Sequence, residues 1–336
     1  MNRDTLYQVV KDIYMSKVFN KSALDFRIMI FNEKLKSLLK KYDSVEERMI
    51  NIEKVYSQID SYLGISEIEK KKNGEVFTPF GLINEMLDTL PVEVWSNPDL
   101  KWLDPANGIG NFPAVVIQRL MIGLKDWEKD EENRYKHIIE NMIYVCDISP
   151  KNMFLYLNIF DPNHEYKMNY FRGSFLDEGF DKHMKDVWKS DSFNEIIGNP
   201  PYNDGNKKNF YIKFFEKSFK IINENGIINF VTPSRYVIQP EFINFRKHIE
   251  KNSKKVIIEN KGRVFGDGAS FSVVTTLIFI GNGCDVDWLS GFEDNILRKF
   301  LSVKNKRLIT NRSKAILKNK EERDLAFHQL SQCLCR

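Results

Sequence analysis

The chain has 336 residues, of which 42% are apolar and 29% charged, the composition of a globular protein with room for one large domain and a smaller one. Its formal net charge of +4 is too small to indicate a polyanionic partner, so the distribution of charge matters more. No apolar run approaches the roughly 20 residues of a membrane helix, and residues 1–12 lack the apolar core of a signal peptide. We therefore expect a cytoplasmic protein without membrane contact.

The cysteines and histidines predict no metal site. The four cysteines show no Cys-x-x-Cys spacing, and the five histidines are widely scattered. Cys146 lies in an apolar strand-like run, where a free cysteine is normally inert core.

Residues 1–72 are predicted to form an N-terminal helical region. Apolar residues recur at helical spacing from Leu24 to Leu39, and Ser44-Val-Glu-Glu47 has the form of a capping box that opens a helix toward Leu63. The region either packs on the main domain as a helical bundle or helps to hold DNA. A polar hinge over residues 69–74 separates it from the main domain.

A helix with an apolar face is predicted from Pro79 to Leu90. Thr78 is a candidate N-cap, with Pro79 at the first helical position and Pro91 closing the helix.

The segment Trp102–Phe112 predicts a short strand, a glycine-bearing turn and the start of a helix. Gly108 and Gly110 allow the backbone to approach a ligand closely, and Asp104 ends the strand. A dinucleotide fingerprint would need a third glycine, which is missing here. The turn therefore favours a ligand without a pyrophosphate, and the acid favours a cationic ammonium group.

Two further predicted strands carry candidate binding residues at their ends. The strand 142–146 ends at Asp147, which is placed to accept two ribose hydroxyls, to cap the helix that opens near Pro150, or both. The strand 166–171 runs into Ser174 and Phe175, and the Phe175 ring could cover a cofactor adenine.

The segment Phe193–Asn203 is the most informative stretch. An apolar strand stops at Gly198, and two prolines then hold the chain extended at the strand's carboxyl end. The Asn199 side chain and the Pro200 carbonyl could each accept a hydrogen from an exocyclic amine, while Tyr202 stacks on its ring. The alternative is an ordinary proline-rich turn.

The rest of the predicted domain continues the alternation of strands and helices. Helices are expected over 210–222 and 241–249, and strands over 226–231, 255–259 and 272–280. The glycine-containing loop 263–271 could lie over a site, with Phe265 or Phe271 as a second stacking face. Alternatively, these rings anchor their own loop in the core.

Together these motifs resemble the amino-group DNA methyltransferases of the gamma arrangement, which are the N6-adenine enzymes of Type I, Type IIG and related restriction-modification systems. The resemblance covers about residues 70–282 and rests on the order and spacing of Phe-Thr-Pro79, Asp104–Phe112, Asp147, Gly-Ser-Phe175 and Asn-Pro-Pro-Tyr202. It implies an α/β fold, a Rossmann-like S-adenosylmethionine-dependent methyltransferase sheet with helices on both faces and an antiparallel last strand. The implied domains are 1–72, 73–284 and a basic C-terminal segment, 285–336.

The resemblance also implies roles for individual residues. The methionine moiety of the cofactor would lie among Thr78, Asp104, Ala106 and Gly108, its ribose on Asp147 and its adenine on Phe175. The target base would be held by Asn199, Pro200 and Tyr202. The full set of implied site residues adds Phe77, Gly110, Phe112, Ile148, Ser174 and Pro201. Ser174 departs from the pattern, because the family often has Asp there, and a hydroxyl accepts from the cofactor amine more weakly.

The C-terminal segment is expected to contact the DNA backbone. Residues 298–320 carry nine basic residues and no acidic one, and such a run is either a phosphate-binding surface or a solvated face. The candidate contacts are Lys304, Lys306, Arg307 and Arg312. About 55 residues follow Gly281, fewer than a recognition domain needs, so we expect a specificity subunit or a further C-terminal region to select the site on double-stranded DNA.

Two alternatives remain. A methyltransferase with the same loop could act on RNA or on a protein glutamine, although such families generally lack the Phe-Thr-Pro motif. A non-catalytic DNA-binding subunit could also retain the fold. No nuclease motif is evident in the sequence.

Overall fold

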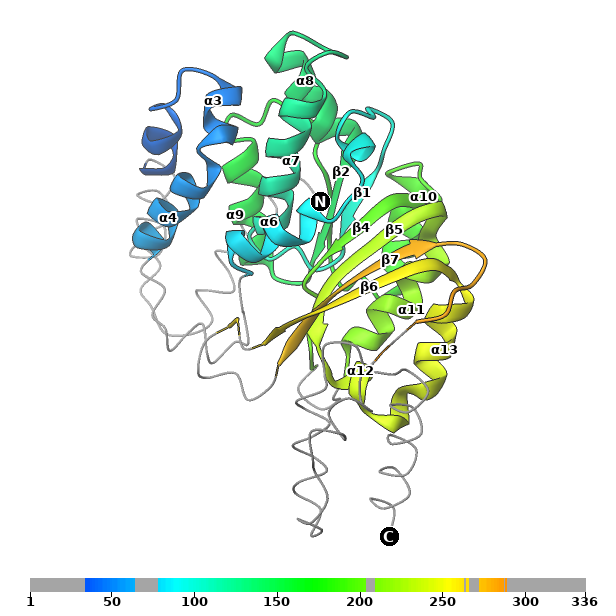
Figure 1. Cartoon of the computed structure of the whole chain (residues 1–336). Coiled ribbons are helices and arrows are strands. Elements are labelled where there is room, and N and C mark those ends of the chain that lie inside the picture. Colours follow the sequence, from blue (N-terminus) through cyan, green and yellow to red (C-terminus); the bar gives the residue numbers. More distant parts are fainter. Residues whose placement is uncertain are drawn as a thin grey trace. The chain divides into compact units, whose positions relative to one another are not determined.

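The computed structural model describes residues 34–63, 78–203, 209–262, 264–265, 272–286 and 288 (Figure 1). The chain divides into two compact units, residues 1–223 and 224–336. Its strands belong to a seven-stranded sheet, to which the first unit contributes β3-β2-β1-β4 and the second β5-β7-β6, in these orders. The predicted domain boundaries near residues 72 and 284 stay predictions, because 64–77 and 289–336 lie outside the described residues.

The first unit contains four parallel strands. β1 pairs with β2 on one side and with β4 on the other, and β2 pairs with β3. The chain therefore moves outward from β1 to β3 and returns to β1's other side with β4. In chain order the elements are α3 (Val45–Ile50), α4 (Ile52–Leu63), α6 (Phe80–Asp88), η1 (Val92–Trp95), β1 (Trp102–Asp104), α7 (Asn111–Gly123), α8 (Glu131–His137), η2 (Ile138–Met142), β2 (Ile143–Asp147), α9 (Pro150–Phe160), β3 (Asn169–Arg172), α10 (Glu178–Asp186), β4 (Phe193–Gly198) and α11 (Tyr211–Ile221).

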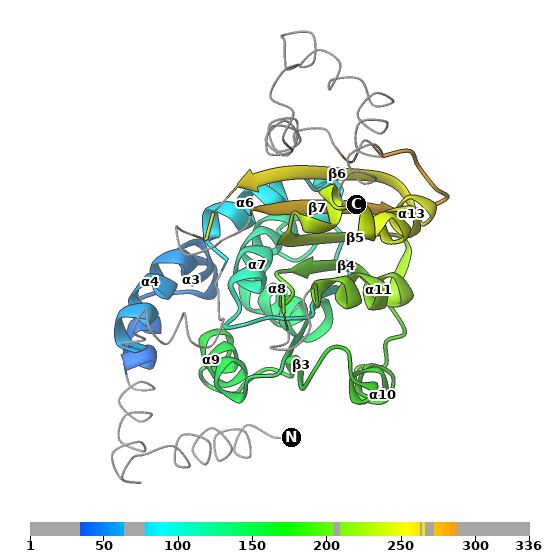
Figure 2. The same cartoon turned by 90° about the horizontal axis from the view of Figure 1, so that it is seen from below.

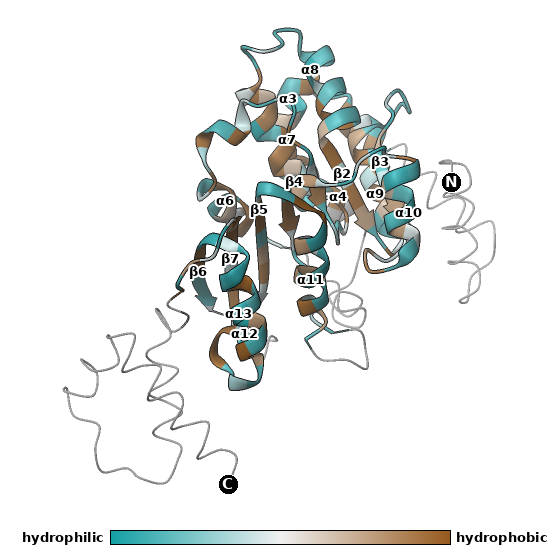
Figure 3. Cartoon of the chain, turned by 90° about the vertical axis from the view of Figure 1, so that its right-hand side faces the viewer, coloured by the Kyte–Doolittle hydropathy of each residue, from teal (hydrophilic) through white to brown (hydrophobic). Residues whose placement is uncertain are grey.

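Helices cover both faces of these strands, as predicted. Figures 1 and 2 show α7 and α9 on one side of β1, β2 and β4, with α10 and α11 on the other side. In Figure 3, hydrophobic residues are concentrated on β2 and β4, while α8 and α10 are largely hydrophilic. Every residue of β1 and β2 is buried. A parallel sheet needs such cover on both faces.

The predicted N-cap at Ser44 is confirmed at the start of α3, but the reciprocal bond of the capping box comes from the Asp43 amide and not from the Ser44 amide. The Ser44 hydroxyl accepts a hydrogen bond from the Glu47 amide at 3.1 Å, and the Glu47 carboxylate accepts from the Asp43 amide at 2.8 Å. The prediction of one continuous helix from there to Leu63 is wrong. Asn51 is the C-cap of α3, its backbone and side-chain amides both donate to the Glu47 carbonyl, at 3.1 Å and 2.9 Å, and a separate helix, α4, begins at Ile52.

Several predicted boundaries also need correction. Pro79, and not Thr78, occupies the N-cap position of α6, without a side-chain cap. β3 begins at Asn169 and not at residue 166, because the Asp161 carboxylate accepts from the amides of Glu165 (2.8 Å) and Tyr166 (3.1 Å) and turns the chain there. Helices α8 and α10 were not predicted from the sequence. In α10 the missing signal is apolar periodicity, since only Phe180 and Met184 are buried.

The second unit contains the antiparallel strands. β7 (Val273–Ile280) pairs antiparallel with both β5 (Ile222–Pro233) and β6 (Ser253–Gly262), so the predicted antiparallel last strand is confirmed. Its helices are α12 (Arg235–Ile238), η3 (Pro240–Phe242) and α13 (Ile243–Lys251). Within the described ranges, none of the helices has the length and apolar character that crossing a bilayer requires.

Candidate active site

The candidate site lies at the carboxyl ends of three strands of the first unit. Asp104 is the last residue of β1, Asp147 is the last residue of β2, and Asn199 follows the last residue of β4. Because these strands are parallel, their carboxyl ends share one edge of the sheet. The strand order reverses between β1 and β4, and open α/β sheets bind ligands at such a point.

Asp104 is a buried acid with free acceptor capacity. Its side chain is 3% exposed, Oδ1 accepts from the Ala106 amide at 3.0 Å, and Oδ2 has no hydrogen-bond partner among the described residues. Burial raises the pKa of Asp104 to about 8, with the Ala106 amide opposing the rise and Asp147 adding to it. Gly198 on β4 allows this close packing, because a Cβ there would lie 2.7 Å from Asp104 Oδ1. The buried oxygen is suited to a cationic group, which would ionise the carboxyl.

Asp147 holds the glycine turn that follows β1. Its Oδ2 accepts from the Gly108 amide at 2.8 Å, and its Oδ1 accepts from the Ser149 amide at 2.7 Å. Gly108 has a φ of 57°, a conformation that favours glycine. The cap of α9 is Ser149, which accepts from the Asn152 amide, so the interpretation of Asp147 as the helix cap is wrong.

The Asn199–Tyr202 loop places an unpartnered acceptor beside an aromatic ring. Asn199 Oδ1 is buried and has no hydrogen-bond partner among the described residues, while Pro200 is buried and Pro201 is exposed. Burial raises the pKa of Tyr202, and a hydrogen bond with the Asn199 side chain opposes the rise. The Tyr202 ring packs edge-on against Tyr211 with centroids 6.5 Å apart. The loop thus presents its amide oxygen and its ring together.

The third predicted motif is packed into the core. Phe175 is 1% exposed and forms an aromatic cluster with Phe180 (centroids 4.9 Å apart) and Phe214 (5.3 Å). Ser174 Oγ accepts from the Leu176 amide at 3.2 Å. Contact of Phe175 with a cofactor adenine stays a prediction, and Ile148, at 73% exposure beside Asp147, presents the most open apolar surface near that position.

The remaining predicted residues are placed as follows. The buried Thr78 is tied to the start of α7, because its carbonyl accepts from the Asn111 side chain at 3.0 Å. Phe112 is 4% exposed, and Phe265 is half-buried in the second unit. Phe77, Phe271, Lys304, Lys306, Arg307 and Arg312 lie outside the described residues, so their roles stay predictions.

Two contacts of the site were not predicted from the sequence. Asn111 reaches Thr78 across 33 residues, and the Tyr56 hydroxyl donates to the Ile109 carbonyl across 53 residues. Neither pair leaves a local pattern in the sequence. In the part of the chain that the structure describes, no group of three or more His, Cys, Asp or Glu side chains could hold a metal ion.

The raised pKa of Asp104 predicts a pH-dependent stability difference between wild type and Asp104→Asn. The folded protein keeps the Asp104 proton up to about pH 8, whereas an ordinary Asp has a pKa of 3.8. Between about pH 4 and about pH 8 the unfolded chain therefore binds fewer protons than the folded protein. The contribution of Asp104 to stability is fully present below about pH 4 and is lost as the pH rises to about 8. Urea midpoints at several values between pH 5 and 9 should therefore fall faster for wild type than for the Asn variant. Parallel curves would contradict the assignment.

The geometry agrees with comparisons to known proteins. Residues 111–265 match the family described as Eco57I restriction-modification methylase. An uncharacterized adenine-specific methylase of Mycoplasma pneumoniae is 45% identical over 80 residues, which cover 23% of this chain and 19% of that protein. The modification methylase CviBIII of Paramecium bursaria Chlorella virus NC1A is 25% identical over 201 residues, covering 55% of this chain and 44% of that protein.

A solved structure shows the same fold. The likeness is to a chain described as the modification subunit of a type I restriction enzyme from Vibrio vulnificus YJ016, with a TM-score of 0.53 and 14% identity over 73% of this chain and 52% of that chain. The chain thus spans about half or less of the length of these relatives. The predicted Rossmann-like methyltransferase fold is confirmed. The chain is thus similar, over residues 111–265, to the Eco57I restriction-modification methylases.

Proposed function

We propose that the chain is an S-adenosylmethionine-dependent DNA methyltransferase that acts on N6 of adenine within a restriction-modification system. The observation that carries this proposal is the unpartnered, buried Asn199 Oδ1 beside Tyr202, at the same sheet edge as Asp104 and Asp147. The family match of residues 111–265 supports it. The Mycoplasma pneumoniae relative, named as an adenine-specific methylase, supports the choice of adenine, and the relative named as a modification methylase supports the role in modification.

The residues present fit S-adenosylmethionine. The buried Asp104 Oδ2 has no partner among the described residues and would accept from the ammonium group of the methionine moiety, with Thr78, Ala106 and Gly108 around it. The Asp147 carboxylate would accept from the ribose hydroxyls. Ile148, Ser174 and Phe175 would border the adenine. Gly108 and Gly110 both have positive φ and present backbone without side chains on the loop between β1 and α7.

When bound, the cofactor supplies an electrophilic methyl group on a sulfonium sulfur. The chain's own contribution is to make a poor amine nucleophile available. Asn199 Oδ1 and the Pro200 carbonyl accept the two amine hydrogens and turn the nitrogen lone pair out of conjugation with its ring. Transfer of the methyl group to this nitrogen would break the bond from the methyl carbon to sulfur and leave one surplus amine proton, which would pass to solvent, since an amide oxygen cannot keep it. Preorganised acceptors of this kind need no reorganisation during the reaction.

Covalent catalysis through cysteine does not fit this site. Cys146 is fully buried in β2, its thiol donates to the Gly173 carbonyl at 3.2 Å, and burial raises its pKa well above the ordinary range. Such a thiol is protonated and inaccessible. Attack by the amine itself is the route that the site supports.

A base in duplex DNA has to leave the stack to reach this loop. Extrusion costs a few kcal/mol, and stacking on an aromatic ring returns about 1 to 3 kcal/mol. Tyr202 would provide this stacking, and the stacking roles of Phe265 and Phe271 stay predictions. Phosphate contacts would come from the basic residues Lys304, Lys306, Arg307 and Arg312, and a specificity subunit would select the sequence.

The proposal is tested by methyl transfer from labelled S-adenosylmethionine to a set of duplex DNA, structured RNA and protein substrates. We expect N6-methyladenine in DNA, measured by mass spectrometry of the nucleosides. Label found only in RNA or protein would contradict the DNA assignment. DNA binding without any label transfer would favour the non-catalytic subunit.

A further inference from the structure

Tyr56 connects the N-terminal helices to the glycine loop between β1 and α7. Its hydroxyl, on α4, donates a hydrogen bond of 2.9 Å to the Ile109 carbonyl. Both residues are buried, with 3% of Tyr56 and 2% of Ile109 exposed. The loop that is proposed to border the cofactor is therefore held from a segment about 50 residues earlier in the chain.

The Ile109 carbonyl needs this donor. The first intrahelical bond of α7 runs from the Ala114 amide to the Gly110 carbonyl at 2.9 Å. The Ile109 carbonyl lies before the N-cap residue Gly110 and so receives no helical hydrogen bond, and Pro113, the residue four positions on, has no N–H to offer it. A buried carbonyl without a donor is costly, and Tyr56 supplies the missing hydrogen bond.

Tyr56 also restricts the glycine next to this carbonyl. Gly110 has a φ of 99°, and a Cβ at this position would lie 2.7 Å from Tyr156 Cδ2 and 3.0 Å from the Tyr56 hydroxyl oxygen. The loop is thus enclosed between α4 and α9. On its other side the Tyr56 ring meets Phe80 edge-on, with centroids 5.3 Å apart. Phe80 begins α6 directly after Thr78 and Pro79, so Tyr56 contacts both segments that are proposed to border the methionine moiety.

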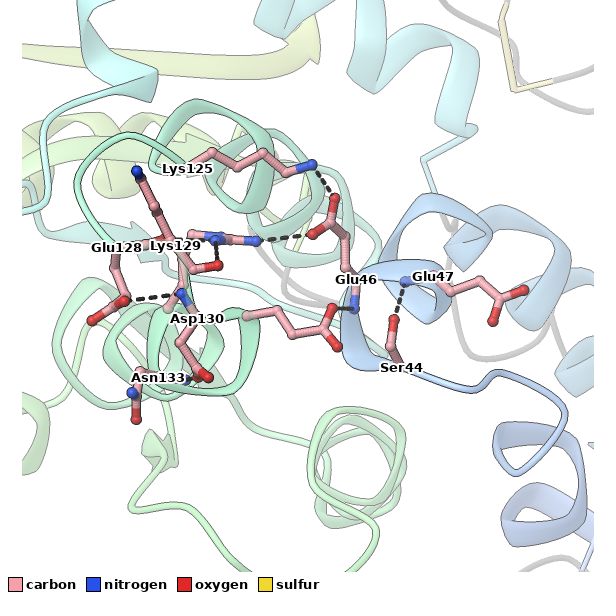
Figure 4. A network of polar contacts seen from close by, with 10 residues as sticks. Ser44, Glu46, Glu47, Lys125, Glu128, Lys129, Asp130 and Asn133 are labelled. Carbon is pink, nitrogen blue, oxygen red and sulfur yellow. Dashed lines mark hydrogen bonds and ion pairs between the residues drawn. The ribbon is translucent and has the colours of Figure 1, made fainter.

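The helices that carry Tyr56 are anchored away from the loop. Figure 4 shows Glu46 of α3 at the centre of a polar network with α7 and α8. Glu46 forms an ion pair with the 1% exposed side chain of Arg134 at 3.0 Å and another with Lys125. Its amide donates to the Glu131 carboxylate at 3.3 Å. In α4, the helix that carries Tyr56, the side chains of Ile52, Val55 and Ile59 are also buried. These buried side chains and the polar network of Glu46 hold the N-terminal helices in place, and with them Tyr56.

We propose that Tyr56 is a positioning residue for the cofactor loop, so that the N-terminal helices form part of the cofactor site. The proposal rests on the proposed function for the identity of the cofactor. Tyr56 itself acts through Ile109 and Gly110. Removing its hydroxyl leaves the aromatic packing in place and frees one buried carbonyl, which should loosen the loop in the cofactor-free protein.

The test compares wild type, Tyr56→Phe and a matched control, Tyr144→Phe. Tyr144 is also buried and donates to a main-chain carbonyl, that of Asn141 at 3.2 Å, and its ring packs against Trp188 and Phe193. Amide hydrogen exchange over residues 106–112 without cofactor should be on the order of 10-fold faster in Tyr56→Phe, the scale of losing one buried hydrogen bond. The dissociation constant for S-adenosylmethionine should rise by a similar factor, with kcat at saturating cofactor near that of wild type. Tyr144→Phe should lower global stability without either effect.

The outcomes separate this inference from the proposed function. Equal loop exchange and equal cofactor affinity in wild type and Tyr56→Phe would overturn the role of Tyr56, as would equal effects in both Phe variants. Failure of the proposed function would appear in wild type itself, as absence of S-adenosylmethionine binding. The hydrogen-exchange comparison needs no cofactor. It therefore tests whether Tyr56 holds the loop whether or not the protein binds S-adenosylmethionine.

Discussion

Replacing Asn199 by alanine is expected to lower turnover by at least about 100-fold, the scale of removing one preorganised polar contact from a transition state. Asn199 Oδ1 is buried without a partner among the described residues, so accepting from the target amine would break no existing hydrogen bond of this oxygen. Alanine keeps the loop backbone and its prolines but removes this acceptor. Single-turnover methylation of duplex DNA measures the chemical step, and calorimetry with S-adenosylmethionine should show near-normal affinity.

Asn158→Ala is the control for the Asn199 variant. Asn158 is also half-buried, but its side chain donates within α9 to the Phe154 carbonyl at 2.8 Å and faces no proposed ligand. Turnover of this variant should stay near that of wild type. A similar loss in both variants would mean that the effect of Asn199→Ala arises from a general disturbance of the fold.

Replacing Asp147 by alanine should have the reverse effect, weakening cofactor binding about 10- to 150-fold, the range for a hydrogen bond to a charged group. The variant loses the proposed ribose acceptor and the bond that holds the Gly108 amide at 2.8 Å. Turnover at saturating cofactor should fall much less, because the target loop follows a different strand. Calorimetry and single-turnover kinetics at high cofactor concentration separate the two quantities.

Asp161→Ala is matched to the Asp147 variant. Asp161 is fully buried and, like Asp147, accepts from two main-chain amides, at 2.8 Å and 3.1 Å, but these are the amides of Glu165 and Tyr166, and neither belongs to the glycine loop. We expect lower stability with unchanged cofactor affinity. If the Asp147→Ala and wild-type proteins bound S-adenosylmethionine with equal affinity, the ribose assignment would be rejected.

Much of the candidate site could be predicted because its residues act through local backbone geometry. Gly198 and the two prolines end β4 and place Asn199 at its carboxyl end, and Gly108 and Gly110 shape the turn after β1, whatever the rest of the chain does. Ser44 likewise caps α3 through a residue only three positions away. Local signals were misleading where a side chain elsewhere turned the chain, as Asp161 does in delaying β3.

The sequence by itself determined the order of the motifs and the chemistry of the target loop, because each depends on residue types within a few positions of one another. Only the tertiary structure decided which groups are buried and which distant residues complete the site. The pKa of Asp104 rises because the fold removes water from it, the Phe175 ring is enclosed by α10 and α11, and Tyr56 satisfies a carbonyl that Pro113 cannot. These properties depend on contacts between segments far apart in the chain, which no local pattern encodes.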